Sequence, residues 1–435
     1  MNKTYDAIVI GAGIIGAAIG FELAKKGYRT LNVDKQPAAG YGSTGNSCAV
    51  VRLHYSTWDG TAMAWESLHH WRDWKKYLNT TDESGLSRYI NTGCLVITSE
   101  HYDVSSYFRY FKDLGIEFEI WDPEKLTRNI PIFTDDSVWP PCLPNDEKFW
   151  SEPVGKITGA VFYSDSGYIN DPQLATHNLQ RAAEANGGEF IFEQEVEKIR
   201  RSENQVVGVA LRSGEQIDAP IVVNVAGPHS FLVNRLAGVQ DLMKIKTRAL
   251  RREVHFVPSP QGFDFESGGY ICADEEVGCY CRPEVGNTIL IGSLDPECEP
   301  KVWIDNPDSY NQAVTIERWK AQVYNFAKRV PSLEIPQHPV GIVDLYDVSD
   351  DWIPIYDKTE LNGYYIAIGT SGNQFKMAPL VGQLMAKLID ACENGHDNDK
   401  EPVQIEGHYT GVRLSAGFYS RLREFHSESS YTVTG

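Results

Sequence analysis

The hydrophobic and polar positions of the first 56 residues follow an order that predicts a βαβ unit. An apolar run over residues 5–10 leads into a glycine-rich turn, and apolar positions at helical spacing follow it. A second apolar run over residues 30–33 ends in Asp34. A strand, a crossover helix and a second strand in this order are typical of a parallel sheet.

The remainder of the chain alternates between helical and strand patterns. Helical spacing predicts helices over residues 60–79, 102–114, 123–129, 171–185, 315–329 and 378–391. Short apolar or alternating runs predict strands over residues 89–99, 159–163, 190–194, 196–202, 206–211, 216–219, 221–225 and 364–368, with antiparallel strands over 240–300. The segments 221–225 and 364–368 are apolar throughout, which favours strands buried on both faces of a parallel sheet. The tail, residues 427–435, is predicted to be disordered.

These elements predict an α/β protein (α+β overall) with more than one domain. The strand, glycine loop and helix of the N-terminal unit recur where residues 364–368 precede Gly369 and a second helix. The sheet that begins at residue 5 is therefore expected to be completed by segments that come much later in the chain. A chain of 435 residues is also too long for one simple core, so two domains, or one with a large insertion, are expected.

Composition and charge narrow the classes of function. The formal net charge of −19 argues against nucleic acid and anionic lipid as partners, because both attract basic proteins. The sequence shows no secretory signal and no apolar run long enough for a transmembrane segment. The eight cysteines are scattered, and the pair Cys279 and Cys281 is too sparse for a zinc site. We therefore expect no metal, free thiols and a cytoplasmic location.

The turn after the first strand, Gly11-Ala12-Gly13-Ile14-Ile15-Gly16, has the spacing G-x-G-x-x-G. In the dinucleotide fingerprint Gly11 allows the tight turn, Gly13 lets the backbone approach a pyrophosphate, and Gly16 lets helix and strand pack closely. The helix N-terminus offers N–H groups to the phosphates, and Asp34 can accept hydrogen bonds from a ribose. Strand, helix, second strand and acid together predict a dinucleotide site; the alternative is a tight turn that binds nothing.

Five further motifs follow this fingerprint in order along the chain. They are Gly42-Ser43-Thr44 leading to Arg52, Gly167-Tyr168-Ile169 with Asp171-Pro172, residues 222–227 (VVNVAG), residues 280–284 (YCRPE) and residues 369–376 (GTSGNQFK). Together the motifs resemble the D-amino-acid oxidase-like superfamily of FAD-dependent oxidoreductases. The nearest members are sarcosine, pipecolate and glycine oxidases and dimethylglycine dehydrogenase-like proteins. The resemblance covers nearly the whole chain.

The resemblance implies two structural domains. One is a Rossmann-like FAD-binding domain of the glutathione-reductase type, discontinuous in sequence and made of residues 1–85, 155–235 and 335–435. The other is a substrate-binding domain with an antiparallel sheet, made of residues 86–154 and 236–334, which would roof the flavin.

The resemblance also implies FAD as the cofactor and names the residues around it. In the relatives of the sarcosine oxidase type a cysteine two residues before Tyr346 holds the flavin covalently, and here that position is Asp344. Non-covalent FAD is therefore expected. The implied cofactor-binding residues are Gly11, Gly13, Ile14, Ile15, Gly16, Asp34, Lys35, Ser43, Thr44, Asn46, Ser47, Val196, Ala226, Gly227, Gly341, Gly369, Gly372, Asn373, Gln374, Phe375 and Lys376.

Two basic residues match positions that bind the substrate carboxylate in these relatives. Arg52 matches an arginine that grips the carboxylate, and Lys376 matches the lysine that completes the clamp. Tyr346 stands where members of the sarcosine type carry tyrosine, which favours secondary or cyclic amino acids as substrates. The alternative is that both cations form structural ion pairs.

Three more residues are candidates for the catalytic site. Tyr55 and Tyr280 are pocket candidates, with core packing as an equal alternative. The lysine that activates oxygen in the oxidases has no clear match, and the nearest cation is Arg282, which can equally be a structural strand residue. Oxidase and dehydrogenase activity therefore both stay open.

The resemblance implies an enzyme that oxidises the C–N bond of a small, carboxylated amine to an imine by hydride transfer to flavin N5. Oxygen or an electron carrier would accept the electrons, and the protein would be a monomer or homo-oligomer without a nucleic-acid partner. Two alternatives stay open: an FAD-dependent dehydrogenase of a 2-hydroxy acid, and a flavin-bearing assembly or scaffold protein without turnover. Release of an amine or ammonia would distinguish the amine-oxidising enzyme from the 2-hydroxy-acid dehydrogenase. A flavin that no small molecule reduces would support the assembly or scaffold protein.

Overall fold

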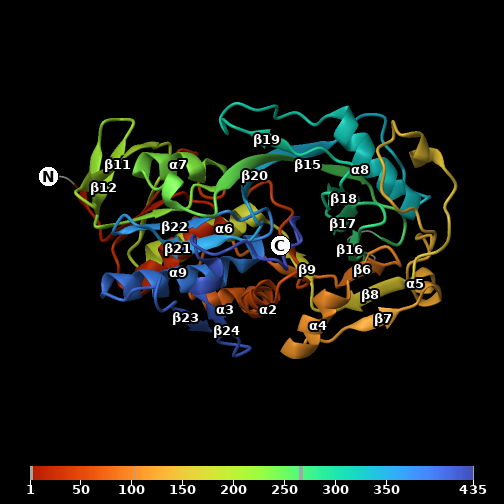
Figure 1. The fold of residues 1–435 in the computed structure, drawn as a ribbon, viewed down its shortest axis with the longest axis horizontal. Helices are drawn as coiled ribbons and strands as arrows, with labels where there is room; N and C mark the ends of the chain where they lie inside the picture. The colour runs from red at the N-terminus through yellow and green to blue at the C-terminus, as the bar shows by residue number, and fades with distance from the viewer. Residues whose placement is uncertain (1–2, 103, 264–267, 435) are drawn as a thin grey trace.

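The computed structural model describes residues 3–102, 104–263 and 268–434. Figure 1 shows two lobes side by side, with a helix-covered sheet in the left lobe and a larger, curved sheet in the right lobe. The end of the chain lies between them. The candidate site lies where the two lobes meet, so the two sheets determine its walls.

The first lobe contains a six-stranded sheet whose strands come from distant parts of the sequence. Its order is β10 (Glu189–Ile191), β3 (Thr30–Val33), β2 (Ala7–Ile10), β14 (Ile221–Asn224), β22 (Tyr364–Ile368) and β21 (Ile355–Lys358). The first five strands are parallel, and β21 pairs antiparallel with β22. The apolar runs expected to be buried on both faces are indeed buried throughout in β14 and β22.

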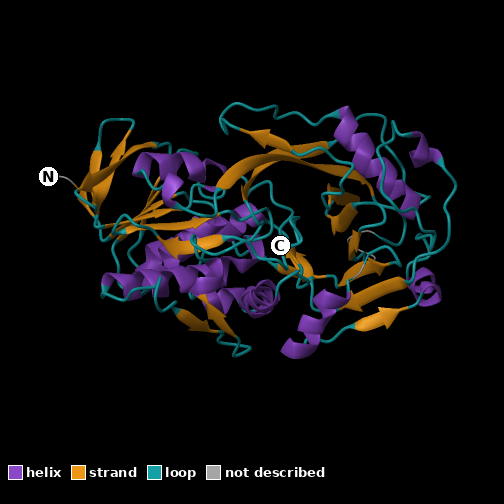
Figure 2. Cartoon of the chain, in the orientation of Figure 1, coloured by secondary structure: helices purple, strands orange, loops and turns teal. Residues whose placement is uncertain are grey.

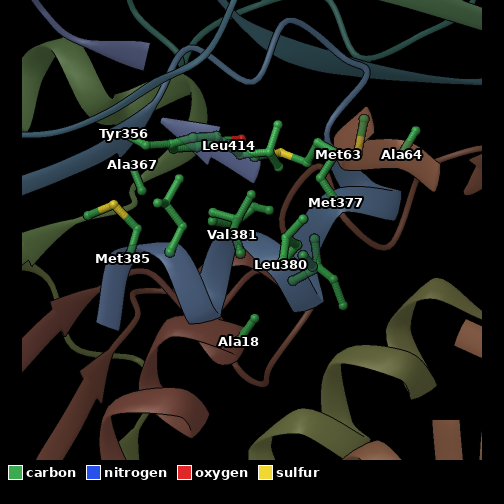
Figure 3. Packing of buried hydrophobic residues seen from close by; sticks show 14 of the residues in the cluster. Ala18, Met63, Ala64, Tyr356, Ala367, Met377, Leu380, Val381, Met385 and Leu414 are labelled. Atoms are coloured by element: carbon green, nitrogen blue, oxygen red, sulfur yellow. The ribbon is translucent and has the colours of Figure 1, made fainter. Parts of the chain in front are cut away.

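Alternate side chains of this sheet enter two different cores, as the period of a strand requires. Ala7 and Val9 of β2 pack in one cluster, whereas Ile8 and Ile10 pack in the other. The first cluster is closed by helices α1 (Ile14–Lys25), α6 (Pro172–Ala185) and α9 (Ala378–Glu393). Figure 3 shows Val381 of α9 between Ala18 of α1 and Ala367 of the sheet. Helices α2 (Trp58–Arg72) and α3 (Trp74–Leu78) extend this cluster.

The second face is covered by a small sheet and one helix. The sheet has the order β1 (Lys3–Thr4), β13 (Gln216–Asp218), β12 (Gln205–Leu211) and β11 (Val196–Ser202). Helix α7 (Ser230–Ala237) packs beside it, and Figure 2 shows this helix on the side of the parallel sheet opposite α9.

The second lobe is built on a nine-stranded sheet. Its order is β19 (Val302–Ile304), β15 (Thr247–Pro258), β18 (Thr288–Ser293), β17 (Cys279–Glu284), β16 (Ile271–Asp274), β6 (Cys94–Thr98), β8 (Gly159–Tyr163) and β7 (Glu119–Trp121), and β20 (Gly341–Ser349) also pairs with β15. All these pairings are antiparallel except β16 with β6. Helices α4 (Ser105–Leu114), α5 (Pro123–Asn129) and α8 (Ile316–Arg329) flank the sheet.

The remaining elements are short. Strands β4 (Val50–Val51), β9 (Gly167–Ile169) and β5 (Tyr89–Asn91) form one small sheet, and β23 (Gln404–Glu406) pairs with β24 (Arg413–Ser415). The 3₁₀ turns are η1 (Glu147–Trp150), η2 (Gly227–His229), η3 (Gln240–Leu242), η4 (Phe375–Met377) and η5 (Ala416–Tyr419).

The fold class expected from the sequence is confirmed: a Rossmann-like parallel sheet stands beside an antiparallel sheet. The segment boundaries given above for the two domains stay a prediction. Strands β8 and β20 pair within the large sheet, although those boundaries assign them to the FAD-binding segments. Strand β5, assigned to the substrate segments, pairs with β9 instead.

The expectation of a disordered tail is wrong for residues 427–434. Ser429, Val433 and Thr434 are buried, at 8%, 8% and 3% exposed, so the tail is anchored on the molecule at these residues rather than extended into solvent. The sequence signal was misleading because the tail is rich in small polar residues, which here bond to one another and to the two lobes.

Candidate active site

The loop that follows β22 forms one wall of the site. Gly369 and Gly372 have φ angles of +68° and +71°, which turn the chain sharply between the strand and α9. The Asp347 carboxylate accepts a hydrogen bond from the Gly369 N–H at 2.6 Å, and the Asp347 carbonyl accepts one from Ser371 at 2.7 Å. The loop is therefore fixed from the second lobe, because Asp347 lies on β20.

Helix α2 holds the far end of this loop. The Trp71 indole donates a hydrogen bond to the Lys376 carbonyl at 2.7 Å, and the Phe375 ring stacks on the Trp71 ring. The Lys376 side chain then points back along the loop, where its Nζ donates to the Asn373 carbonyl at 2.7 Å.

Arg52, Tyr55 and Lys376 are brought together from opposite ends of the chain. Lys376 Nζ lies 2.8 Å from the Tyr55 hydroxyl, and the Arg52 guanidinium lies 4.2 Å from the centre of the Tyr55 ring. The Tyr55 hydroxyl donates to the Asn373 carbonyl at 2.8 Å. We name Arg52, Tyr55 and Lys376 the cationic cluster.

Burial changes the protonation of this cluster. Lys376 is 3% exposed, and desolvation together with the positive charge of Arg52 lowers its pKa well below the usual lysine value. Burial also raises the pKa of Tyr55 to about 12, so its hydroxyl stays protonated. A carboxylate placed between Arg52 and Lys376 would restore the charged form of the lysine, because an opposite charge favours it.

Aromatic residues of the large sheet face the cluster. The Tyr346 ring lies against Gly372 so closely that a Cβ added there would come within 2.1 Å of the ring. Tyr280 contacts Gly292 on the next strand, and its hydroxyl lies 3.1 Å from the Cys48 sulfur. Burial raises the pKa of Tyr346 to about 12. Both tyrosines thus form a neutral roof opposite the loop.

Arg282 lies in a different environment from the cationic cluster. Its guanidinium donates to the carbonyls of Cys48 and Pro283, each at 2.9 Å, and pairs with Glu284 at 2.7 Å. It also stacks 4.2 Å from the Tyr168 ring. These contacts make Arg282 a residue that holds the Cys48 segment against β17.

Sequence reasoning missed a second buried arginine in the roof. Arg252 forms an ion pair with Asp295, donates to the Ser293 carbonyl at 3.1 Å and lies 5.4 Å from the Tyr346 ring. Trp352, packed in the same apolar cluster as Tyr346, was missed as well. No motif marks either residue, since Arg252 is one of two adjacent arginines in an alternating strand.

The N-terminal turn has the features that a dinucleotide needs. A Cβ at Gly11 would lie 2.3 Å from the Val225 carbonyl oxygen, and φ there is +118°, so only glycine fits this crossing of β2 and β14. Helix α1 begins at Ile14 with no acidic residue in its first turn, and its N-terminus faces the segment 40–46. The Asp34 carboxylate accepts hydrogen bonds from the N–H groups of Ala12 and Gln36 at 2.7 and 2.9 Å.

The segment after β3 closes over this turn. Thr44 Oγ1 accepts a hydrogen bond from the Ile14 N–H at 3.1 Å, and the Gly40 N–H donates to the Ala12 carbonyl. These positions fit FAD: an uncapped helix N-terminus suits the pyrophosphate, and a fixed carboxylate at the end of β3 suits a ribose.

Asp344 ties the same segment to β20. Its carboxylate accepts hydrogen bonds from the Ser43 hydroxyl at 3.1 Å and the Asn46 side-chain amide at 2.6 Å. Ser43 also donates to the Leu345 carbonyl at 2.8 Å. The residue that replaces the expected cysteine therefore fixes the loop that carries three of the predicted cofactor residues.

The other predicted cofactor residues fall into two groups. Those near Asp34, Gly11 or Thr44 are Gly13, Ile15, Gly16, Lys35, Ser47, Val196, Ala226 and Gly227, and those in the Gly369 loop are Gln374 and Phe375. Gly341 joins neither group. It begins β20 opposite His255, at the end of that strand away from Tyr346.

The C-terminal segment lies on the cationic cluster. The Val433 carbonyl accepts hydrogen bonds from Arg52 Nη2 and, at 3.1 Å, from the Asn373 side-chain amide. The Ser56 N–H donates to the Thr434 carbonyl at 3.1 Å. The second contact of Arg52 is the carbonyl of His54. Among the described residues, the hydrogen-bond acceptors of this guanidinium are thus neutral carbonyls of the protein's own backbone.

Asp82, Glu83 and His177 lie close together, but Asp82 accepts from His177 at 2.8 Å and Glu83 pairs with Arg181, so the group is a local hydrogen-bonded cluster. Of the helices within residues 3–102, 104–263 and 268–434, none combines the length and apolar character needed to cross a membrane.

Comparison with known proteins gives a family and relatives. Residues 6–388 match the family model described as FAD dependent oxidoreductase (DAO). The chain is 23% identical over 446 residues to the FAD-dependent oxidoreductase domain-containing protein 1 of Mus musculus, covering 96% of this chain and 84% of that protein. It is 23% identical over 399 residues to the sarcosine oxidase subunit beta of Rhodobacter capsulatus, covering 89% and 85%. The structure of L-proline dehydrogenase from P. horikoshii superposes with a TM-score of 0.73 at 22% identity, covering 89% of this chain and 94% of that one.

Proposed function

The chain belongs to the FAD dependent oxidoreductase family, and from that premise we propose that it oxidises the C–N bond of a small amino acid that carries a secondary or cyclic amine. The cationic cluster would hold the substrate carboxylate. The product would be an imine, which water then hydrolyses.

The single observation that carries this proposal is the meeting of Arg52 and Lys376 beneath a roof of Tyr280 and Tyr346. Within residues 3–102, 104–263 and 268–434, the partly buried Arg52 guanidinium and the buried Lys376 amine bond to backbone carbonyls and to the Tyr55 hydroxyl, an arrangement that suits an anionic ligand. Arginine can hold a carboxylate through two parallel hydrogen bonds, and lysine adds a point charge.

The relatives support the substrate class. Two of the three reported above carry names that refer to sarcosine and proline, and both of these are secondary amino acids. At identities of 22% and 23% these names suggest a class rather than a particular substrate. Tyr346 adds support, because its hydroxyl is buried and neutral and adds no second charge to the pocket.

The residues of this protein mainly position the substrate. FAD, when bound, would accept the hydride that leaves the substrate carbon and with it the two electrons of the oxidation. Arg52 and Lys376 fix the carboxylate, which fixes the orientation of the neighbouring C–H bond. Tyr280 and Tyr346 exclude water from above, which strengthens the electrostatic interactions within the site.

We propose that FAD is held non-covalently. Asp344 offers no thiol, and its carboxylate is already occupied by Ser43, Asn46 and the Leu345 N–H. Denaturation with acid or urea should therefore release all of the flavin into solution, and flavin that stays on the chain would contradict this.

Anaerobic reduction of the flavin tests the function. The FAD-loaded protein is mixed without oxygen with sarcosine, L- and D-proline, pipecolate, glycine and 2-hydroxy acids, and the visible flavin band is followed. Bleaching by a secondary amino acid, with amine or imine products, supports the proposal. Bleaching only by a hydroxy acid, without release of amine or ammonia, supports a 2-hydroxy-acid dehydrogenase instead.

The same experiment separates two further alternatives. The rate at which the reduced protein recolours in air distinguishes an oxidase from a dehydrogenase that needs a carrier. A flavin that no member of the panel bleaches would support an assembly protein without turnover. Arg52→Met should abolish bleaching at substrate concentrations that saturate the unmodified protein, and Arg413→Met, at a largely exposed position, is the matched control.

A further inference from the structure

The C-terminal residues lie between the two walls of the proposed substrate site. Figure 1 shows the end of the chain at the centre of the molecule, between the lobes. The backbone of this segment bonds to both walls, since Lys301 of the second lobe donates to the Tyr431 carbonyl at 3.3 Å and Asn373 of the first lobe donates to the Val433 carbonyl at 3.1 Å.

The Val433 carbonyl is bonded to Arg52, the cation that would bind the substrate carboxylate in the proposed function. It accepts from Arg52, which otherwise bonds to the carbonyl of His54. A carbonyl oxygen and a carboxylate oxygen compete for the same donor, but the carboxylate forms the stronger, charge-assisted hydrogen bond. Val433 and a substrate carboxylate therefore cannot occupy this position together.

The Val433 side chain fills the apolar part of the same site. It is 8% exposed and packs in a cluster with Leu250, Leu294 and Trp352, and the rings of Tyr280 and Tyr346 pack against that cluster. The pocket under the roof is thus shaped for a small branched or cyclic aliphatic group next to a position for a carboxylate oxygen.

We propose that Val433 is an internal mimic of the substrate, so that the C-terminal strap (residues 429–434) covers the site and leaves when substrate binds. The inference rests on the proposed function and deepens it in two ways. The substrate carries a small branched or cyclic aliphatic group beside its carboxylate, and the strap competes with it for Arg52.

The strap is held by contacts that are few enough to be broken. Val433 is its one member in the apolar cluster, and Tyr431 is 41% exposed. The hydroxyls of Ser430, Thr432 and Thr434 bond to one another within 2.8–2.9 Å, and Ser429 donates to the Asp351 carbonyl at 2.6 Å. These three hydroxyls can therefore keep their bonds to one another when the strap leaves, while Ser429 keeps it attached.

A non-oxidisable ligand tests the inference apart from turnover. The probe is 3-methylbutanoate, which is valine without its amino group and so offers no C–N bond to oxidise. Its affinity for the FAD-loaded protein is measured from the shift of the visible flavin band. Removing residues 432–435 should lower the Kd by about tenfold or more, because the competitor is gone.

A second, full-length variant tests the inference in case the shortened chain misfolds. Val433→Ala keeps the backbone and removes two methyl groups from the pocket, so its Kd should fall between those of the full and shortened chains. Phe425→Ala, in an exposed side chain of the same C-terminal region, should leave the Kd unchanged. Melting curves establish that each variant is folded.

Hydrogen exchange provides a readout that does not depend on the flavin signal. Adding 3-methylbutanoate should speed exchange at the amides of residues 429–434 and leave the β22 and α9 amides unchanged. An unchanged Kd in the folded, shortened chain, or unchanged exchange at the strap on binding, overturns the inference. If a secondary amino acid still bleaches the flavin in that case, the proposed function stands and the strap alone is wrong. If 3-methylbutanoate binds neither the full nor the shortened chain, the inference about the strap is wrong. If, in addition, no amino acid of the panel bleaches the flavin, the proposed function is wrong as well.

Discussion

Lys376 Nζ lies 2.8 Å from the hydroxyl of Tyr55, although 321 positions separate the two residues in the chain. The contact joins the segment after β4 to the loop after β22, and Trp71 and Asp347 fix that loop from outside. It keeps a buried amine next to Arg52, whose positive charge disfavours the charged form of the amine until an anion binds. The geometry is therefore prepared for a carboxylate before one binds.

Replacing Lys376 tests whether the free site is already arranged to bind a carboxylate. Lys376→Met keeps the length and burial of the side chain but removes the donor. A hydrogen bond to a charged group contributes about 1.5–3 kcal/mol, which corresponds to a Kd that is roughly ten to one hundred times higher. The Kd of 3-methylbutanoate measured by the flavin band should rise by this factor. Lys387→Met, an exposed lysine on α9, is the matched control, and an equal loss in both variants would contradict a role in the site.

The pH dependence of ligand binding has a defined sign. Because the pKa of Lys376 is lowered in the free protein, the amine is neutral above that pKa and a bound carboxylate must recruit a proton. Affinity for the carboxylate should therefore fall as pH rises through and above the lowered pKa. Titrations at several pH values in the unmodified protein and in Lys376→Met should show this fall only in the former.

The contribution of Lys376 to folding stability should change with pH in the opposite direction to the ligand affinity. Between the lowered pKa of folded Lys376 and its ordinary value in the unfolded chain, unfolding takes up a proton, so the contribution of this residue to stability rises with pH. Below the lowered pKa the cost of charging the buried amine is fully present. The difference in unfolding free energy between the unmodified protein and Lys376→Met should change with pH in this window, and a difference that is flat would mean that the lysine is solvated.

Two glycines near the N-terminal turn form a matched pair for cofactor binding. Gly11→Ala would place a Cβ 2.3 Å from the Val225 carbonyl oxygen, at a φ of +118°. Such backbone strain costs about 1–3 kcal/mol even before the clash is relieved, so FAD affinity and the melting temperature should both fall. Gly42→Ala meets no atom within 4 Å and serves as the control. Equal FAD affinity in the two variants would mean that the turn does not hold the cofactor.

Asp344 should contribute to FAD affinity without touching the chemistry. Asp344→Ala removes the acceptor for Ser43 and Asn46, and the loss of these hydrogen bonds should raise the Kd of FAD by about tenfold. At saturating FAD, the rate of anaerobic bleaching should be close to that of the unmodified protein. A normal Kd combined with slow bleaching would instead assign Asp344 to the substrate site.

The sequence alone determined the local parts of the molecule. The period of apolar residues predicted the strand at residues 159–163 and the helix at residues 123–129 with the bounds that the structure has. The spacing of Gly11, Gly13 and Gly16 with Asp34 predicted the βαβ unit, because neighbouring residues set a turn of this kind. Family resemblance then identified Arg52 and Lys376, which the structure brings together.

Only the tertiary structure decided which distant segments share the site. Arg252 enters the roof and Val433 enters the pocket through contacts across the whole chain, and neither carries a local signal. The tail has a polar composition that favours disorder, yet the walls of both lobes supply partners for its backbone. Periodicity reports the burial of one element against its neighbours, whereas the filling of a pocket depends on surfaces that exist only after both lobes have folded.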